Sequence, residues 1–433
     1  MKSLPASILL LACGLCAAAP GEPLDGIARE YLFLELSMGL HDANHVDAYF
    51  GPASIRDDAK AAHLSLDDID ARAAELAGRL RGLAADSGDG ERQARIAGLL
   101  ARLAALDTRI DLKRGHTLPF DDESRRIFGV AAPDYDAAHF AAVLEEIDRL
   151  VPGEGELAER VDAFRNRFVV PDERLPAVFE AAIAECRRRT LEHIALPEGE
   201  SFRIEYVTDK PWTGYNWYQG NAHSLIQINR GLPIYVSRAV ELGCHEGYPG
   251  HHTFNTLLEK RLVEEKGWVE FSLYPLFSPQ SLIAEGSGNY GIDLAFPGNE
   301  RVAFEKRELF PLAGLDPAEA ERYYQLLDLL DELSYAGNEA ARDYLNGTIS
   351  REEAVQWLID YTLASPERAE QRVDFFDTYR SYVINYNFGE DLVRDWVEAG
   401  TDSEAERWAR FEELLSTPML PVDLVRTAGE SAP

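Results

Sequence analysis

The sequence is organised around eight consecutive residues, His245-Glu246-Gly247-Tyr248-Pro249-Gly250-His251-His252. No other segment of this length combines as many side chains that bind metals or transfer protons. Two imidazoles can hold Zn²⁺, and a carboxylate directly after the first histidine can accept a proton from a water activated by that ion. These residues therefore predict a metal site that supports hydrolysis.

The spacing of the histidines predicts a break in the helix that carries them. A helix brings residues four apart onto one face, but the fourth residue after His245 is Pro249, which has no N–H and disfavours helix at the residue before it. On a straight helix His251 would lie about 240° round the axis from His245, whereas His252 would return to the same face about 10.5 Å along. We expect an expanded turn at the proline that brings His251 back as the second metal ligand, with His252 as the alternative.

The pattern His-Glu-x-x-Pro-Gly-His-His resembles the signature of the bacterial domain of unknown function 885 family, a group of zinc metallopeptidase-like proteins related to the gluzincins. The resemblance covers residues 201–433 and implies a third metal ligand at Glu285, the position of a glutamate that begins a Glu-Gly-Trp-Ala-like segment in that family. This sequence has Ser287 and Gly288 where the aromatic residue and the alanine usually stand. A glutamate at position 285 also suits the chemistry of the ion, because Zn²⁺ held by two imidazoles needs an anionic oxygen donor.

The same resemblance implies a role for a tyrosine near the carboxyl end. The family carries a tyrosine three residues before a glycine in its last helical region, and Tyr386 holds this position before Gly389. A phenol there can donate a hydrogen bond to the oxyanion that forms when a carbonyl is attacked. Tyr379 and Tyr382 are the alternatives, and three tyrosines at this spacing are also typical of a buried helix face.

Two segments before the motif alternate apolar and polar residues and are predicted to be strands, residues 202–207 and 223–229. The loop between them is rich in tryptophan and tyrosine, which is more typical of a packed hairpin than of a binding wall. In gluzincin-like enzymes an edge strand in this place pairs with the extended substrate. The resemblance therefore implies that Gln227 and Asn229 lie on a substrate-binding edge strand.

The rest of the 433-residue chain is predicted to be mostly helical. From residue 66 to 112 leucine and alanine recur every three or four residues on both sides of an Asp86–Gly90 turn, which predicts a helical hairpin. Further helices are expected at residues 137–150, 157–168, 173–193, 317–345 and 350–363. We predict a mainly α fold with a small β-sheet, a zincin-like helical metallopeptidase architecture, with a helical region at 21–200 and a zinc-binding catalytic region at 201–433.

Residues 1–20 have the composition of a signal peptide, with one lysine, a leucine-rich apolar run and then small residues. The run is too short for a membrane-spanning helix. Leu10-Leu11-Ala12-Cys13 also resembles a bacterial lipobox, so a lipid anchor at Cys13 is an alternative to a soluble form. We expect secretion across the inner membrane, to the periplasm or as a membrane-anchored lipoprotein.

Two cysteines follow the signal region, Cys186 and Cys244. They could form one bridge in an oxidising compartment, but two cysteines exclude a disulfide framework. We expect Cys244, which precedes His245, to be a small buried hydrophobic residue rather than a redox group.

The formal net charge of the chain is −32, from 75 acidic and 43 basic residues. This charge repels nucleic acid and anionic membrane surfaces, so neither is expected as a partner. The charge favours solubility, but it determines neither the fold nor the oligomeric state.

Together these features predict a zinc-dependent peptidase in which His245, His251 and Glu285 hold the ion and lower the pKa of a water toward about 7. Glu246 would take the proton of that water during attack on the peptide carbonyl and pass it to the leaving amine. Two alternatives stay open. One is a metal-containing binding lipoprotein without turnover, and the other is a zinc hydrolase of non-peptide amides or esters.

Overall fold

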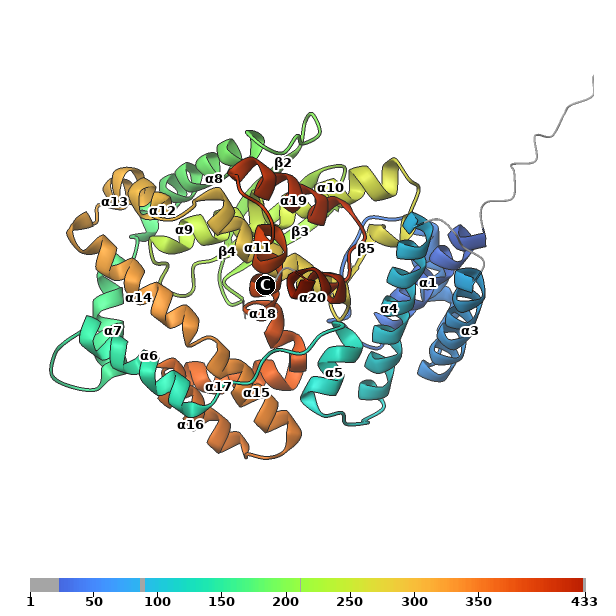
Figure 1. Ribbon diagram of the computed structural model, residues 1–433, viewed down its shortest axis with the longest axis horizontal. Helices are drawn as coiled ribbons and strands as arrows, with labels where there is room; N and C mark the ends of the chain where they lie inside the picture. The colour runs from blue at the N-terminus through green and yellow to red at the C-terminus, as the bar shows by residue number, and fades with distance from the viewer. Residues whose placement is uncertain (1–22, 86–89, 211, 431–433) are drawn as a thin grey trace, which may run out of the picture.

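The computed structural model describes residues 23–85, 90–210 and 212–430, and Figure 1 shows how they are arranged. The predicted signal peptide and the lipid anchor at Cys13 lie outside these residues. Within the described residues, no helix combines the length and the apolar composition that crossing a membrane requires.

The fold is mainly α with a small β-sheet, as predicted. The first helices are α1 (Pro23–Met38), α2 (Ala53–Ala62), α3 (Leu66–Ala85), α4 (Gly90–Lys113), α5 (Phe120–Ile127), α6 (Ala137–Leu150), α7 (Leu157–Arg165) and α8 (Leu175–Leu191). The predicted helical hairpin is confirmed by α3 and α4.

The second half of the chain continues with shorter helices. They are α9 (Ser237–Leu242), α10 (His251–Leu258), α11 (Pro279–Ala295), α12 (Glu300–Phe304), α13 (Phe310–Ala313), α14 (Ala320–Glu332), α15 (Tyr335–Asn346), α16 (Arg351–Thr362), α17 (Pro366–Tyr379), α18 (Phe388–Glu398), α19 (Glu404–Ser416) and α20 (Pro421–Glu430). The single helix predicted for residues 317–345 is wrong, because the chain turns between α14 and α15.

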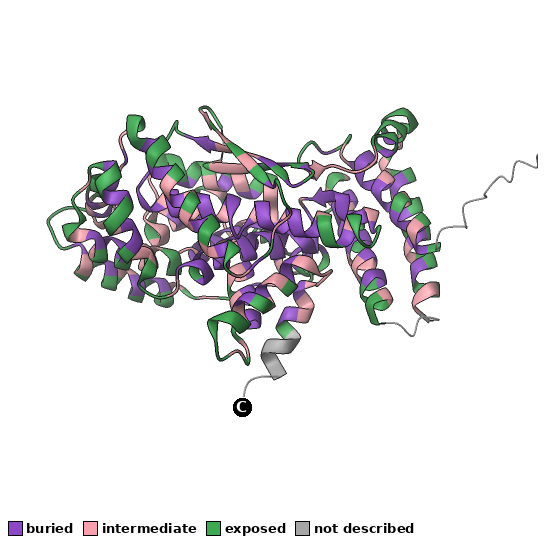
Figure 2. Cartoon of the chain, turned by 90° about the horizontal axis from the view of Figure 1, so that it is seen from above, coloured by how far each residue is buried: buried purple, intermediate pink, exposed green. Residues whose placement is uncertain are grey.

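The helix α11 runs through the middle of the protein, and nearly all of its residues are buried. Figure 2 shows the buried residues gathered along the centre and the exposed ones at the rim. Glycines let the neighbours of α11 approach closely. A Cβ at Gly286 would lie 2.2 Å from the carbonyl oxygen of Gly389 in α18, and one at Gly288 would lie 2.8 Å from the His245 ring. The Ser287-Gly288 segment therefore suits a helix packed on all sides.

The hydrophobic residues form one large core and smaller clusters. The large core extends from Ala105 to Leu424 and so joins residues on both sides of position 200. A separate cluster is formed by α1, α3 and α4. The helices α5 to α8, which precede position 200, thus belong to the same core that supports the motif.

The strands are β1 (Val46–Tyr49), β2 (Ser201–Val207), β3 (Gly214–Gly220), β4 (His223–Asn229) and β5 (Leu273–Pro275). The two predicted strands are confirmed as β2 and β4. The aromatic segment between them is β3, which forms the expected hairpin with β4. A second sheet pairs β1 with β5, and the sequence pattern did not predict it.

The three-stranded sheet has the order β2-β4-β3, with β4 parallel to β2 and antiparallel to β3. Because β4 is the central strand, both of its backbone edges are already paired. The prediction that Gln227 and Asn229 lie on an edge strand is therefore wrong. Alternation of apolar and polar residues identifies a strand but carries no information about which strands lie beside it.

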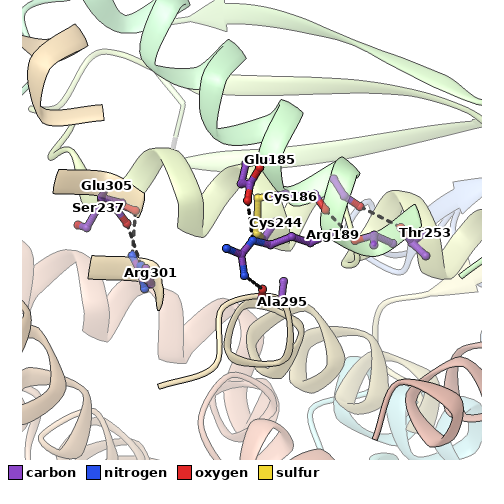
Figure 3. The surroundings of a disulfide bond; sticks show 11 residues. Glu185, Cys186, Arg189, Ser237, Cys244, Thr253, Ala295, Arg301 and Glu305 are labelled. Carbon is purple, nitrogen blue, oxygen red and sulfur yellow. Dashed lines mark hydrogen bonds and ion pairs between the residues drawn. A yellow bond between two sulfur atoms is a disulfide. The ribbon is translucent and has the colours of Figure 1, made fainter. Parts of the chain in front are cut away.

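A disulfide joins α8 to the residue that precedes the first histidine of the motif (Figure 3). Its cysteines, Cys186 and Cys244, are fully buried and their Cα atoms lie 5.5 Å apart. The single bridge that the sequence left open is therefore formed, because the fold packs α8 against the motif, and Cys244 is buried as expected but is not a free thiol. In Figure 3 Arg189, also on α8, donates to the carbonyl of Ala295 at 2.8 Å. The helix α8 therefore holds both the motif and the end of α11.

Replacing both Cys186 and Cys244 with alanine should lower the free energy of unfolding by about 4 kcal/mol. The bridge closes a loop with a sequence separation of 58 residues and so restricts the unfolded chain. Denaturant titration of the oxidised protein and the double variant measures the difference. The reduced wild-type protein is the control and should lose a similar amount; no loss in either sample would contradict the pairing.

Candidate metal centre

The helix that carries the motif widens before its second histidine. The helix α9 continues into a π-helical turn, η3 (Gly243–Gly247), which is followed by a cis Tyr248–Pro249 bond. The amide of Gly250 then donates to the carbonyl of Cys244 at 3.0 Å. A Cβ at position 250 would lie 1.9 Å from the carbonyl oxygen of His245, so the turn requires glycine. The expanded turn that the proline predicted is confirmed.

This turn brings His251 beside His245, with the ring centroids 4.5 Å apart. The Nε2 of His245 lies 3.4 Å from Oε2 of Glu285, and the Nε2 of His251 lies 3.9 Å from Oε1. One ligand atom from each of the three residues lies within 4.8 Å of the others. The structure thus assembles two imidazoles and a carboxylate, a donor set that can hold a metal ion.

His252 has a different position, inside the protein. Its Nδ1 lies 2.8 Å from the hydroxyl of Ser224, and its Nε2 lies 3.0 Å from Oε2 of Glu200. Both ring nitrogens are therefore occupied, and the side chain is fully buried. The geometry selects His251 over His252 as the partner of His245.

Neighbouring side chains hold the ligand residues in place. Asn289 on α11 accepts a hydrogen bond from Nδ1 of His245 at 2.8 Å, and its amide donates to the carbonyl of Tyr386 at 2.7 Å. The Tyr382 hydroxyl donates to Oε1 of Glu285 at 2.8 Å. Such contacts fix the tautomer and the orientation of a ligand, and here they leave Nε2 of His245 free to bind a metal.

Burial and neighbouring charges shift the pKa values of His245 and His251 in opposite directions. Burial and the charge of the nearby His245 together lower the pKa of His251 to about 4, although Glu285 opposes the shift, so this imidazole is neutral at physiological pH. Burial also opposes protonation of His245, but the hydrogen bond to Glu285 and the charge of Glu246 outweigh it and raise its pKa to about 9. A dication bound at Nε2 would take the place of that proton.

Glu246 follows the first histidine and is buried beside it. No described residue hydrogen-bonds to its carboxylate. Burial and the charge of Glu285 raise its pKa to about 7, although His245 opposes this shift. Gly214 of β3 leaves space next to it, because a Cβ there would lie 3.2 Å from Oε1 of Glu246. A free carboxylate with a pKa near neutrality suits a general base.

The three candidate tyrosines have different surroundings. The Tyr382 hydroxyl is bound to Glu285. The Tyr379 ring packs on Phe375 with centroids 4.5 Å apart. Burial and the carboxylates of Glu285 and Glu246 raise the pKa of Tyr386 well above its usual value, so its phenol stays protonated close to both. Of the three, Tyr386 is therefore the tyrosine that combines this proximity with a hydroxyl free of hydrogen bonds to the described residues.

Asp47 is a residue near the site that the sequence did not indicate. It lies on β1, and its carboxylate accepts a hydrogen bond from the hydroxyl of Tyr215 on β3. Burial, with the charges of Glu285 and Glu246, raises its pKa to about 8. No sequence signal relates Asp47 to the motif, since only folding brings β1 beside β3.

The structure does not bring Gln227 and Asn229 into the cluster. Asn229 donates to the carbonyls of Lys210 and Trp212 at 2.9 and 3.0 Å, and so closes the turn before β3. Gln227 accepts from the indole of Trp217 at 3.1 Å and donates to Glu205 at 3.1 Å. Both side chains therefore form hydrogen bonds within the sheet and its turn.

No protein-family model matches this chain, and no curated protein matches it. Among solved structures, the chain is similar to a "putative lipoprotein" from Colwellia psychrerythraea, with 14% identity and a TM-score of 0.51 over 84% of this chain and 69% of the other. An M32 carboxypeptidase from Deinococcus radiodurans R1 matches with 13% identity and a TM-score of 0.43 over 94% and 95% of the two chains. A "putative lipoprotein of unknown function" from Shewanella oneidensis matches with 14% identity and a TM-score of 0.39 over 92% and 82%.

At these identities, the similarity to the Colwellia psychrerythraea protein supports a shared fold and nothing further about chemistry. The family resemblance therefore rests on the motif residues alone, while the geometry of the cluster shows that three of the predicted residues come together.

Replacing His251 with alanine should remove the bound metal, because this imidazole is one of the three ligands of the cluster. The protein should stay folded, because the side chain is partly exposed. The matched change His252→Ala should keep the metal but lower the free energy of unfolding by about 2–5 kcal/mol, because it leaves a cavity and removes a buried hydrogen-bond partner from both Ser224 and Glu200. Metal analysis together with thermal melting measures both effects. Stoichiometric metal in His251→Ala would contradict the assignment.

Proposed function

We propose that this protein is a zinc-dependent peptidase. The observation that carries the proposal is the unbound carboxylate of Glu246 beside a cluster of two histidines and one glutamate. A site with three protein ligands leaves a coordination position for a water or a substrate, and an adjacent free carboxylate supplies the base that hydrolysis needs.

The residues present fit zinc. Two imidazole nitrogens and one carboxylate suit zinc better than magnesium or calcium, which prefer oxygen ligands. When bound, zinc supplies a Lewis acid that lowers the pKa of a water and polarises a carbonyl. A purely structural zinc site usually has four protein ligands, often with cysteine, and Cys244 is held in the disulfide. The donor set therefore favours catalysis over a structural role.

Glu246 acts as the general base in this proposal. Its carboxylate takes a proton from the attacking water and later delivers it to the leaving amine. None of the described residues competes for its oxygens by a hydrogen bond, so they are available for both transfers.

Tyr386 acts as the oxyanion donor. Its protonated phenol lies close to Glu285 and Glu246, and it donates to the negative oxygen that develops as the carbonyl is attacked. Tyr382 has a supporting role, because its hydrogen bond orients the carboxylate of Glu285.

The sheet supplies a candidate surface for the substrate backbone. The strand β3 is the edge strand nearest to Glu246, and Gly214 keeps the space beside that carboxylate open. An extended peptide can add to such an edge through main-chain hydrogen bonds. This edge favours a peptide over a non-peptide amide or ester, neither of which offers the repeating backbone groups that a strand edge binds.

The alternative of a metal-containing binding lipoprotein without turnover has less support. Such a protein has no need of a free buried carboxylate beside its metal, because burying an uncompensated charge costs stability. Glu246 is placed in this way.

We further propose that the protein works in the periplasm, either soluble or anchored through Cys13. The disulfide between Cys186 and Cys244 supports an oxidising compartment, because cytosolic proteins seldom keep such bonds. The signal-like composition of residues 1–20 points the same way.

Replacing Glu246 with glutamine should lower kcat on a peptide substrate by at least about 10³-fold, because proton transfer is needed at both attack and departure. Metal content and melting temperature should stay near those of the wild type, because the ligand set is unchanged. Glu264→Gln, which alters an exposed glutamate on the same segment of chain, is the matched control and should keep full activity. Wild-type turnover in Glu246→Gln would overturn the mechanism.

Replacing Tyr386 with phenylalanine should lower kcat by about 10²–10³-fold with little change in KM, because its hydrogen bond strengthens only as negative charge develops. Tyr382→Phe should instead weaken metal binding, since Glu285 loses its hydrogen bond. Tyr379→Phe is the control and should change neither. Steady-state kinetics and metal titration of the three variants separate these outcomes, and normal kcat in Tyr386→Phe would leave the oxyanion without this donor.

A further inference from the structure

The expanded turn of the motif leaves the backbone carbonyl of Glu246 without its usual helical partner. In a regular helix this carbonyl would accept a hydrogen bond from the amide four residues later, at Gly250. Here the amide of Gly250 donates to Cys244 instead, and the residue before Gly250 is Pro249, which has no N–H. Because Glu246 is buried, its carbonyl needs a donor from another part of the protein.

Asn216 on β3 supplies this donor. Its Nδ2 donates to the carbonyl of Glu246 at 2.6 Å. The residue is only 8% exposed, and its Oδ1 is buried without a hydrogen-bond partner among the described residues. A buried acceptor left unpaired lowers stability, so an apolar residue of the same size would suit a position that only needs filling. The amide N–H is therefore the part of Asn216 that this position uses.

The strand β3 contacts the side chain of Glu246 as well as its main chain. Successive side chains of a strand point to opposite faces, so Gly214 and Asn216 share one face. A Cβ at position 214 would lie 2.6 Å from Cδ2 of Leu242 and 3.2 Å from Oε1 of Glu246. One face of β3 thus leaves space for the carboxylate at Gly214 and binds the carbonyl at Asn216.

The same strand is the proposed binding edge for the substrate backbone. A peptide that adds to β3 through main-chain hydrogen bonds has a fixed register relative to this strand. The hydrogen bond from Asn216 fixes Glu246 relative to the same strand. The distance between the base and the substrate backbone therefore depends on a single side-chain hydrogen bond.

We propose that Asn216 is a positioning residue, whose hydrogen bond to the Glu246 carbonyl holds the general base in register with a substrate bound along β3. The proposal rests on the proposed peptidase function. Asn216 acts through Glu246 and does not contact the substrate, because its side chain is buried. Reacting groups need a defined mutual orientation, and a misplacement of about 1 Å can cost about 100-fold in rate.

Asn216→Leu tests the proposal, because it keeps a similar side-chain volume and removes the donor. For a peptide chosen from a quenched fluorescent library by wild-type cleavage, kcat should fall about 10-fold to 100-fold with little change in KM. Zinc content should stay stoichiometric, because the three metal ligands are unchanged. Asn216→Ser keeps a shorter donor and should lose less activity, which also serves if the leucine variant folds poorly. Wild-type kcat in Asn216→Leu would overturn the proposal.

Two control variants separate positioning from a general loss of stability. Asn346→Ala on α15 removes another asparagine that binds a backbone group, the amide of Phe120 at 2.8 Å, and should lower the melting temperature with normal kcat. Gln219→Leu changes an exposed amide on β3 and should alter neither. If Asn346→Ala lost as much kcat as Asn216→Leu at equal melting temperature, stability would account for both effects and the proposal would fail.

Hydrogen exchange of the zinc-free protein tests the positioning without any turnover. The amides of Tyr248 and Gly250 donate to Gly243 and Cys244 and so hold the expanded turn. Both should exchange about 10-fold faster in Asn216→Leu, because the turn loses its hydrogen bond to β3. Unchanged exchange would overturn the proposal. Faster exchange in a protein that cleaves no peptide would support the positioning of Glu246 and count against the peptidase function alone.

Discussion

The backbone hydrogen bond from Gly250 to the carbonyl of Cys244 determines where the second histidine of the motif lies. It spans more residues than a helical hydrogen bond, so the chain gains an expanded turn instead of a regular one. On a straight helix His251 would face about 240° away from His245. With the turn, both Nε2 atoms face Glu285. The close approach of the backbone at position 250 explains why a glycine stands there.

The site depends on segments that are far apart in the chain and packed at very short range. The helix α11 supplies Glu285 and Asn289, and glycines on α11 and α18 let these helices cross with their backbones in contact. The disulfide fixes α8 to the residue before His245. A larger residue at Gly288 would push the His245 ring away. The departure from the aromatic pattern of the resembled family at Ser287-Gly288 thus has a packing reason in this protein.

Two polar groups close to this cluster have no hydrogen-bond partner among the described residues. They are the carboxylate of Glu246 and the hydroxyl of Tyr386. Elsewhere in the interior, charges such as Arg95 with Glu270 and Arg109 with Asp42 are paired. A polar group left unpaired lowers stability, so Glu246 and Tyr386 are candidates for groups that bind a ligand.

The sequence by itself determined the mainly helical fold class, the strands β2 and β4, and the turn at Pro249, because periodicity and the missing N–H of proline act within a few residues. It also named the three residues of the cluster, although Glu285 came from a family resemblance. Tertiary structure alone decided between His251 and His252, made β4 a central strand, paired Cys186 with Cys244, and brought Asp47 toward the motif. These outcomes depend on which elements pack together, and contacts between distant residues leave no periodic signal in the chain.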